Sequence, residues 1–176
     1  MGCRSVFVYK DDYMEKVSMQ LRLDNIHELE YRYRATPRKM MKYKGEPVHV
    51  NLSVSVYPDL HENLLELVTG VQYVVLEDGF PEELLNYKIA LLYWVCNLSQ
   101  YVQAQHQKVS VSSELLSIML GVGVGSLRGM LTLRTDKTVF SHFPLPIINI
   151  SHVIATMKGD VLQNNAVSPI FRFKYE

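Results

Sequence analysis

Strict alternation of apolar and polar residues runs from Val48 to Val56. Every second position is apolar, and short polar side chains or a histidine lie between them. A period of two is typical of a strand with one buried face. Valine dominates the apolar positions, which suits the pleated surface of a sheet. The pattern therefore predicts a strand over Val48–Val56, the least ambiguous element of the chain.

Shorter runs indicate further strands. Val17 to Leu23 also alternates, and the other candidate strands are at residues 5–9, 71–76, 108–111 and 171–175. Residues 26–33 and 147–157 fit either a strand or a helix, because short apolar runs do not distinguish the two.

Three segments have helical patterns. Asp59 and Glu62 have the spacing of a capping box, and apolar residues follow with helical spacing as far as Val71. A second helix is predicted to begin at Pro81, and its apolar stretch from Ile89 to Cys96 predicts the buried core helix. A third, shorter helix is predicted after Ser112 or Ser113, as far as Leu120.

The glycines between Gly121 and Gly129 predict a flexible turn, followed by a hairpin of residues 130–134 and 138–143. They do not form a dinucleotide-binding fingerprint, because Ser126 occupies the position of its third glycine. Strands with helices interposed irregularly predict an α+β fold. We expect one domain with a mainly antiparallel sheet packed against two or three helices. Residues 1–45 would be a basic N-terminal region, partly packed on a core of residues 46–176.

Charge is segregated although 18 basic and 18 acidic residues balance. Residues 48–103 hold one Lys or Arg against seven Asp or Glu, whereas the flanking segments are basic. The most basic stretch, residues 31–44, mixes cations with tyrosines and methionines. The predicted anion-binding residues are Arg32, Arg34, Arg38, Lys39, Lys42 and Lys44.

Two interpretations of residues 31–44 are open. Cations interleaved with aromatic rings can bind phosphates while the rings stack on bases or lie at a lipid headgroup boundary. Alternatively, the segment is a solvated loop whose cations pair with the acidic middle of the chain.

No catalytic constellation is evident. The six histidines lack metal-ligand spacing, and there is no P-loop or nucleophile elbow. We therefore expect a non-enzymatic protein without a metal or another cofactor. Two cysteines, Cys3 and Cys96, do not form a disulfide framework and favour a reducing, intracellular compartment.

Two short motifs bear on membranes. Gly2 and Cys3 are candidate lipidation sites, although Val6 stands where N-myristoylation prefers Ser or Thr. Tyr57-Pro58-Asp59-Leu60 matches the Y-P-x-L form of a viral late-budding motif. The same four residues also fit a strand-to-helix turn, in which Asp59 caps the helix and Leu60 is buried.

The order of predicted elements across residues 46–143 resembles that of the matrix proteins of rhabdoviruses. The similarity lies in the strand at Val48–Val56, the helix at Leu60–Val68, the tyrosine-bearing apolar helix from Tyr87 to Ser99 and a strand after Gly129. The chain length resembles the short matrix proteins of plant-infecting members.

This resemblance implies a structural protein that lines the viral envelope, condenses the ribonucleoprotein and assembles with itself. Its partners would be other copies of the chain, the viral nucleocapsid, an anionic membrane surface and host budding machinery. It would lie in the virion beneath the envelope, and in the host cytoplasm and membrane periphery. The alternative is a soluble RNA-binding or host-interaction module that uses residues 31–44.

Overall fold

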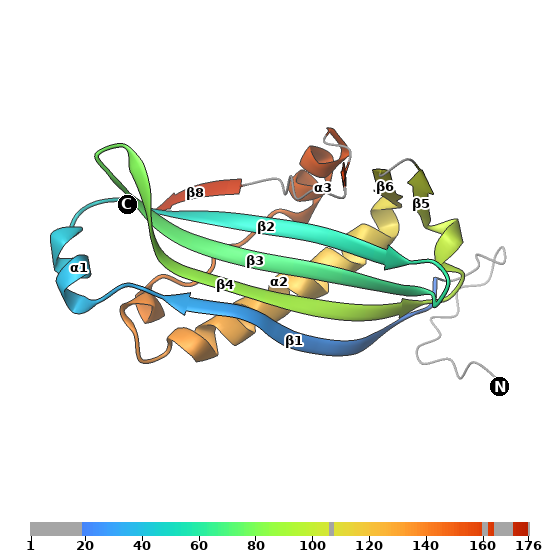
Figure 1. Ribbon diagram of the computed structural model, residues 1–176, viewed down its shortest axis with the longest axis horizontal. Helices are drawn as coiled ribbons and strands as arrows, with labels where there is room; N and C mark the ends of the chain where they lie inside the picture. Colours follow the sequence, from blue (N-terminus) through green and yellow to red (C-terminus); the bar gives the residue numbers. More distant parts are fainter. Residues whose placement is uncertain (1–18, 106–107, 160–161, 164–170, 176) are drawn as a thin grey trace.

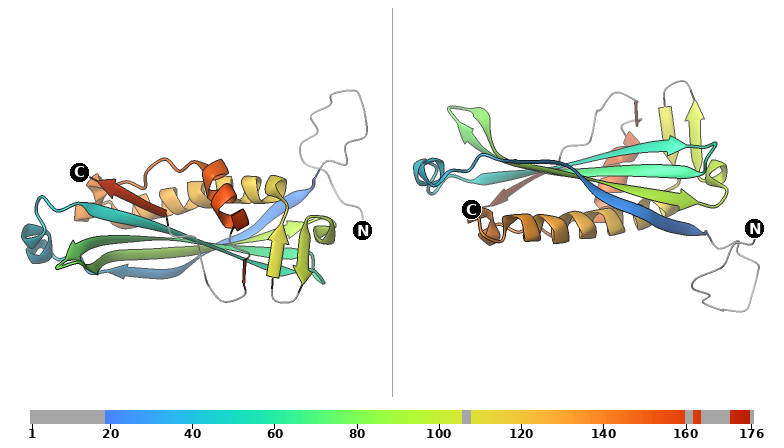
Figure 2. Two further views of the ribbon diagram at one scale, coloured as in Figure 1. Left: turned by 90° about the horizontal axis from the view of Figure 1, so that it is seen from above. Right: turned by 60° about the horizontal axis from the view of Figure 1, so that its bottom comes forward.

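The computed structural model describes residues 19–105, 108–159, 162–163 and 171–175. Five antiparallel strands form the main sheet, in the spatial order β1 (Leu21–Tyr33), β4 (Phe80–Val95), β3 (Leu64–Glu77), β2 (Val48–Asp59) and β8 (Phe171–Tyr175) (Figure 1). Helices α2 (Ser113–Thr135) and α3 (Ile150–Gly159) lie on one side of this sheet (Figure 2). The predicted single-domain α+β fold with a mainly antiparallel sheet is confirmed.

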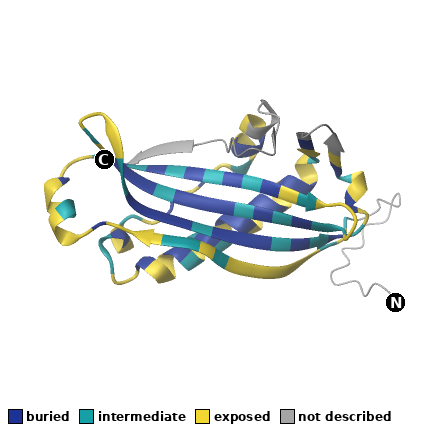
Figure 3. Cartoon of the chain, in the orientation of Figure 1, coloured by how far each residue is buried: buried dark blue, intermediate teal, exposed yellow. Residues whose placement is uncertain are grey.

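The predicted strand at Val48–Val56 is confirmed as the main part of β2. Its alternate residues from Val48 to Val56 are buried on the side of the sheet that carries α2. Figure 3 shows bands of buried residues along β2, β3 and β4, whereas most of the edge strand β1 is exposed. The core therefore lies between α2 and the three central strands.

The helix predicted over residues 60–71 is wrong, because this segment turns and then forms β3. Asp59 Oδ1 does accept hydrogen bonds from the backbone N–H groups of His61 (3.0 Å) and Glu62 (3.1 Å). These bonds close the β2–β3 hairpin instead of starting a helix, since an Asx turn uses the same side-chain geometry as a helix cap. Leu60, which was expected to be buried, is 39% exposed.

The predicted core helix from Pro81 is also wrong, because the segment is the central strand β4. The face toward α2 is buried, and the opposite face carries Ala90, Leu92 and Trp94. A strand that is apolar on both faces loses the period-two pattern in its sequence. The β3–β4 connection is an Asp78-Gly79 turn in which both residues have positive φ (51° and 83°), as tight hairpins require.

The predicted helix after Ser112 is confirmed, but it continues to Thr135. Ser112 caps it, since its Oγ accepts the backbone N–H of Leu115 at 3.4 Å. The predicted glycine turn and the hairpin over residues 130–143 are wrong. Glycine costs a helix about 1 kcal/mol relative to alanine, and burial of Leu127 and Leu131 against the sheet offsets that cost.

α2 is seated close to the sheet. A Cβ atom added at Gly123 would lie 2.7 Å from the Cδ2 atom of Leu67 and 3.3 Å from the Cγ2 atom of Thr69. By length and hydropathy α2 is apolar enough to cross a membrane, and 44% of its most apolar window is buried inside the protein. A core helix of a folded domain meets the same criterion.

Smaller elements complete the domain. They are α1 (Pro37–Lys42), the 3-10 turns η1 (Leu98–Gln100) and η2 (Val139–His142), and a second sheet of β5 (Val102–Gln105), β6 (Lys108–Val111) and β7 (Leu162–Gln163). The predicted strands at residues 108–111 and 171–175 are confirmed. Residues 26–33 are strand, and 147–157 become helical from Ile150. The candidate strand at residues 5–9 lies outside the described residues.

Candidate functional site

Four of the six predicted cations of the basic segment lie close to carboxylates of the same chain. Arg32 lies near the end of β1, Arg34 follows it, and α1 carries Arg38, Lys39 and Lys42. α1 begins after Thr36, whose Oγ1 accepts the backbone N–H of Lys39 at 3.3 Å. This end of the molecule also carries the β3–β4 hairpin (Figure 1), which holds the acidic residues Glu77, Asp78, Glu82 and Glu83.

Two of the three cations of α1 contact that hairpin. Lys39 pairs with Glu82, and Lys42 pairs with Glu77. The hydrogen bond with Glu77 raises the pKa of Lys42, and the same bond, followed by one from Tyr43, lowers the pKa of Glu77. Both charges of this pair are therefore held in the ionised form.

Two further predicted cations are also close to carboxylates. The Nε atom of Arg32 is 2.6 Å from Glu30 Oε1, and that of Arg34 is 3.8 Å from Glu83 Oε1. Within the described residues, Arg38 and Lys44 make no ion pair. Four of the six predicted anion-binding residues thus lie close to acidic side chains of the same chain, and three of these four have partners on the β3–β4 hairpin as their closest carboxylates.

The Y-P-x-L motif lies at the end of β2 and in the following turn. Tyr57 is 48% exposed and stands opposite Glu66 of β3. Pro58 and Asp59 are also paired with β3, so most of the motif is part of a hairpin rather than a free extended peptide. Gly2 and Cys3 lie outside the described residues.

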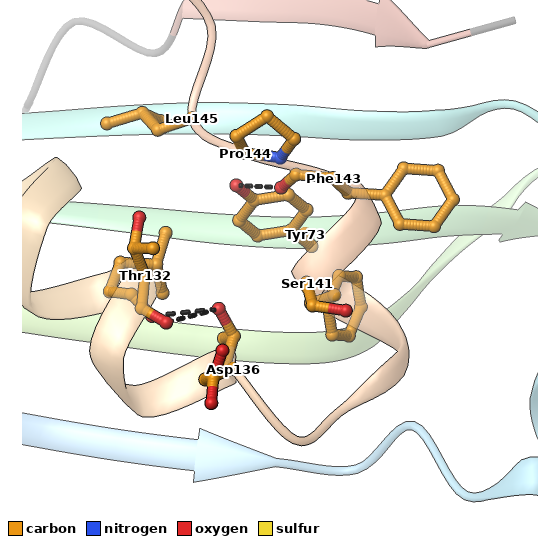
Figure 4. Close-up of a pocket in the computed structure, with 10 residues that line it drawn as sticks. Tyr73, Thr132, Asp136, Ser141, Phe143, Pro144 and Leu145 are labelled. Atoms are coloured by element: carbon orange, nitrogen blue, oxygen red, sulfur yellow. Dashed lines mark hydrogen bonds between the residues drawn. The ribbon is translucent and has the colours of Figure 1, made fainter.

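A small hollow lies where α2 ends above β3. Its floor is buried and apolar, and is formed by Tyr73, Leu131, Phe140 and Leu145. Its volume is about 80 Å³. Figure 4 shows it between the last turns of α2 and residues 143–145, with Tyr73 of β3 between them.

The walls of this hollow are fixed by hydrogen bonds and aromatic contacts. The hydroxyl of Tyr73 donates to the carbonyl oxygen of Phe143 at 3.0 Å, which ties the loop to β3 (Figure 4). The ring of Phe140 lies 5.0 Å from that of Tyr73 and 6.0 Å from that of Phe143, centroid to centroid. Exposed residues form the rim, namely Thr132, Asp136, Ser141 and Pro144.

The same loop is anchored to α2 by Arg128. Its Nε donates to the carbonyl oxygen of Leu145 at 3.2 Å, and its Nη2 donates to that of Pro146 at 2.8 Å. A guanidinium with two carbonyl partners on consecutive residues holds the loop in one position. The hollow is therefore preformed.

A second surface of note lies along β1 and the outer side of α2. Leu23 and Ile26 stand opposite Tyr93 and Leu91, so they point to the side of the sheet that carries α2, yet they are 38% and 36% exposed. The exposed apolar residues of α2 are Ile118, Val122 and Leu133. We call these five residues the β1–α2 face.

An ion pair ties β1 to the end of α2. Arg134 Nε and Nη2 donate to the two oxygens of Glu28 at 2.7 and 2.8 Å, and these bonds lower the pKa of Glu28. The buried ring of Tyr87 lies against that of Tyr31, with centroids 5.9 Å apart. Burial, with Glu28 as the next cause, raises the pKa of Tyr87 to about 12.

Neither surface was found from the sequence. The hollow joins residues of β3, α2 and the loop after η2, and a hairpin was expected where α2 ends. A usable signal did exist: Phe140 and Phe143 flank a segment that leads into Pro144 and Pro146, which is typical of a rigid, packed connection. Among the described residues, no group of three His, Cys, Asp or Glu could hold a metal ion.

Comparison with known proteins gives no family. No family model and no curated protein matches the chain. One similar solved structure is a Mycobacterium tuberculosis SecB-like chaperone in complex with a ChAD peptide from the HigA1 antitoxin. It is 10% identical in sequence, the match covers 73% of this chain and 86% of that chain, and the TM-score is 0.44. A Streptococcus agalactiae protein of unknown function is 13% identical over 75% of this chain and 99% of that chain, with a TM-score of 0.31. At these TM-scores neither likeness carries an argument about this chain.

Proposed function

We propose that this chain is a non-enzymatic polypeptide-binding protein whose hollow at the end of α2 receives one apolar side chain. The observation that carries the proposal is the size of the hollow together with its lining. Small-molecule and cofactor sites occupy about 300–1,000 Å³, whereas this hollow has about 80 Å³. A hollow of this size fits a short aliphatic side chain.

The chemistry of the rim supports the same proposal. Thr132 and Ser141 carry hydroxyls that can hydrogen-bond the backbone on either side of an inserted residue, and Asp136 adds a carboxylate. An apolar floor with a few polar groups at the mouth orients an extended peptide without needing a large cavity. The loop that forms one wall is already held by Tyr73 and Arg128, so little ordering accompanies binding.

The experiment is a fluorescence-anisotropy titration with two dye-labelled peptides of about 12 residues that differ only in a central leucine or serine. Burying a leucine contributes about 1.5–3 kcal/mol, so the leucine peptide should bind roughly 10–100-fold more tightly. Ser141→Trp, which fills the hollow, should remove that preference.

Ser99→Trp is the matched control. Ser99 is exposed in η1, which follows the end of β4. Tyr73 of the hollow pairs with Leu85, near the start of β4, so Ser99 lies far from the hollow. We expect this variant to bind like the wild type. Equal affinity for the two peptides, or an unchanged preference in Ser141→Trp, would contradict the proposal.

The matrix-protein and RNA-binding interpretations stay predictions. Two helices on which the rhabdovirus resemblance was based, Leu60–Val68 and Tyr87–Ser99, are strands or turns in the structure. For binding to an anionic surface, Arg38 and Lys44 are the informative positions, because the other predicted cations contact carboxylates. Co-sedimentation with anionic and neutral liposomes at two salt concentrations tests this, and Arg38→Glu with Lys44→Glu should abolish any salt-sensitive pelleting.

A further inference from the structure

One long edge of the main sheet has no neighbouring strand among the described residues. β1 is 13 residues long and pairs with β4 along one side only. Residues 22 to 27 are all exposed. The backbone N–H and C=O groups along an edge strand can bind a strand of another chain.

Two β-bulges interrupt this edge, at Asp24 and Leu29. Bulges usually hinder edge pairing, because the extra residue breaks the register with a regular strand. A second copy of β1 running antiparallel carries the same two bulges in reverse order. When Ile26 stands opposite Ile26 of that copy, the bulge at Asp24 of one copy lies beside the bulge at Leu29 of the other. The one-residue shifts in register that the two bulges introduce therefore cancel.

Charge favours this register over the one centred on His27. With Ile26 at the centre, Arg22 of each copy stands opposite Glu30 of the other, and Asp24 stands opposite Glu28. The Arg22–Glu30 pairs are opposite in charge, and the like charges of Asp24 and Glu28 are offset by Arg22 and Arg134 of their own chains. With His27 at the centre, the two Arg22 side chains would instead stand opposite the two Arg32 side chains. Directly opposed like charges destabilise an antiparallel pair, and opposite charges stabilise it.

The apolar side chains agree with the same arrangement. A two-fold axis at Ile26, perpendicular to the sheet, places the α2 helices of both copies on the same side. Leu23 and Ile26 point to that side, and on α2 the exposed Ile118 and Val122 follow at a spacing of four residues. The axis brings the β1–α2 faces of the two copies together.

The available area is of the right order. Pairing over residues 21–31 gives a contact about 36 Å long, at roughly 3.3 Å per residue. With the neighbouring helix, about 10 Å across, and one strand spacing of about 4.8 Å, the strip covers roughly 500 Å² in projection. A standard protein interface buries roughly 800 Å² of accessible surface on each partner. A projected area is smaller than the accessible surface that the same contact buries, so the two values are of the same order.

We infer that the β1–α2 face binds a second copy of this chain, through antiparallel pairing of two β1 strands centred on Ile26. The two main sheets then form one continuous sheet across the two-fold axis. The basic residues 32–44 and the acidic β3–β4 hairpin are not needed for this contact, because they lie outside the paired residues 21–31. The inference does not depend on the proposed peptide site, which lies elsewhere on the molecule.

Cysteine cross-linking tests the register in the full chain, with Cys3 and Cys96 replaced by serine. Only residue 26 faces its own copy in this register, with Cβ atoms about 4.5–5.5 Å apart. Ile26→Cys should therefore form a covalent dimer under mild oxidation or with a short thiol cross-linker. His27→Cys should not, because it stands opposite Asn25. A dimer from His27→Cys alone would overturn the register.

Light scattering on a size-exclusion column tests the interface itself. We expect wild type at twice the chain mass, or an even multiple, and Ile26→Lys at half the wild-type mass, because two like charges meet on the axis. Ile147→Lys is the matched control, since Ile147 is 91% exposed in the loop before α3, and it should keep the wild-type mass. A wild-type monomer at high concentration, or an unchanged mass in Ile26→Lys, would overturn the inference.

Discussion

The two sides of α2 carry glycines under opposite conditions. On the inner side, a Cβ atom added to Gly123 would collide with Leu67 of β3. On the outer side, Cβ atoms added to Gly121, Gly125 or Gly129 would meet nothing within 4 Å among the described residues. The inner glycine is thus explained by packing within this chain, and the outer three are not. The inner side of α2 is therefore closely packed, whereas the outer side has open space and exposed apolar side chains.

The largest expected effect is on the inner side of α2. Gly123→Val forces a branched side chain against Leu67 and Thr69, and overpacking of this kind should lower the free energy of unfolding by about 3 kcal/mol. Urea denaturation followed by the fluorescence of Trp94 measures it, since the chain has one tryptophan. Gly125→Val is the control on the outer side and should stay within about 0.5 kcal/mol of wild type. Equal losses in both variants would mean that the two sides do not differ.

An intermediate effect, this time an increase in stability, is expected for substitution of Thr69, which also lies under α2. Its Oγ1 atom is buried and has no hydrogen-bond partner within the described part of the chain. Thr69→Val has the same shape and removes the unpaired hydroxyl, so stability should rise by about 1 kcal/mol. Thr135→Val is the matched control, because the Thr135 hydroxyl donates to the carbonyl oxygen of Leu131 at 2.8 Å. Its stability should fall in the same urea assay, and a loss at Thr69 as well would disprove the assignment.

A third effect is confined to alkaline pH and concerns Tyr87, near the end of α2 that β1 contacts. The pKa of Tyr87 is about 12 in the folded protein against an ordinary value of 10.0. A raised folded-state pKa stabilises the protein below pH 10, and this contribution is lost as the pH rises from 10 toward 12. Urea midpoints across that range should fall more steeply in wild type than in Tyr87→Phe. Tyr57→Phe, at an exposed position, should follow the wild-type slope.

Secondary structure is easiest to predict from the sequence where one face of an element is polar. β2 alternates strictly because its second face carries small polar residues, and it was predicted within a few residues. β4 was mistaken for a helix because Leu92 and Trp94 make its open face apolar too. The predicted helix ends too early, at Leu120, because glycine disfavours a helix locally. The burial of α2 against β3 and β4, which stabilises the rest of the helix, is a tertiary effect that a local sequence pattern does not contain.

The candidate sites were harder to predict than the fold. The cations of residues 31–44 were recognised, but their partners on the β3–β4 hairpin are about 35–50 positions away, and the expected helix there hid the hairpin. The hollow requires Tyr73 and Phe143 to meet, which depends on how α2 crosses the sheet. The exposed edge of β1 follows from the strand order, in which the first strand pairs with the fourth.

That strand order also has a consequence for synthesis of the chain. β1 ends at Tyr33, but its partner β4 is complete only at Val95, roughly 60 residues later. At a translation rate of about 5–20 residues per second, β1 waits about 3–12 s for the strand on which it docks. Meanwhile β2 and β3, which are neighbours in sequence, can pair at once, since local contacts form faster than distant ones. We therefore expect β1, which leaves the ribosome before β2, β3 and β4, to be the last of these four strands to pair.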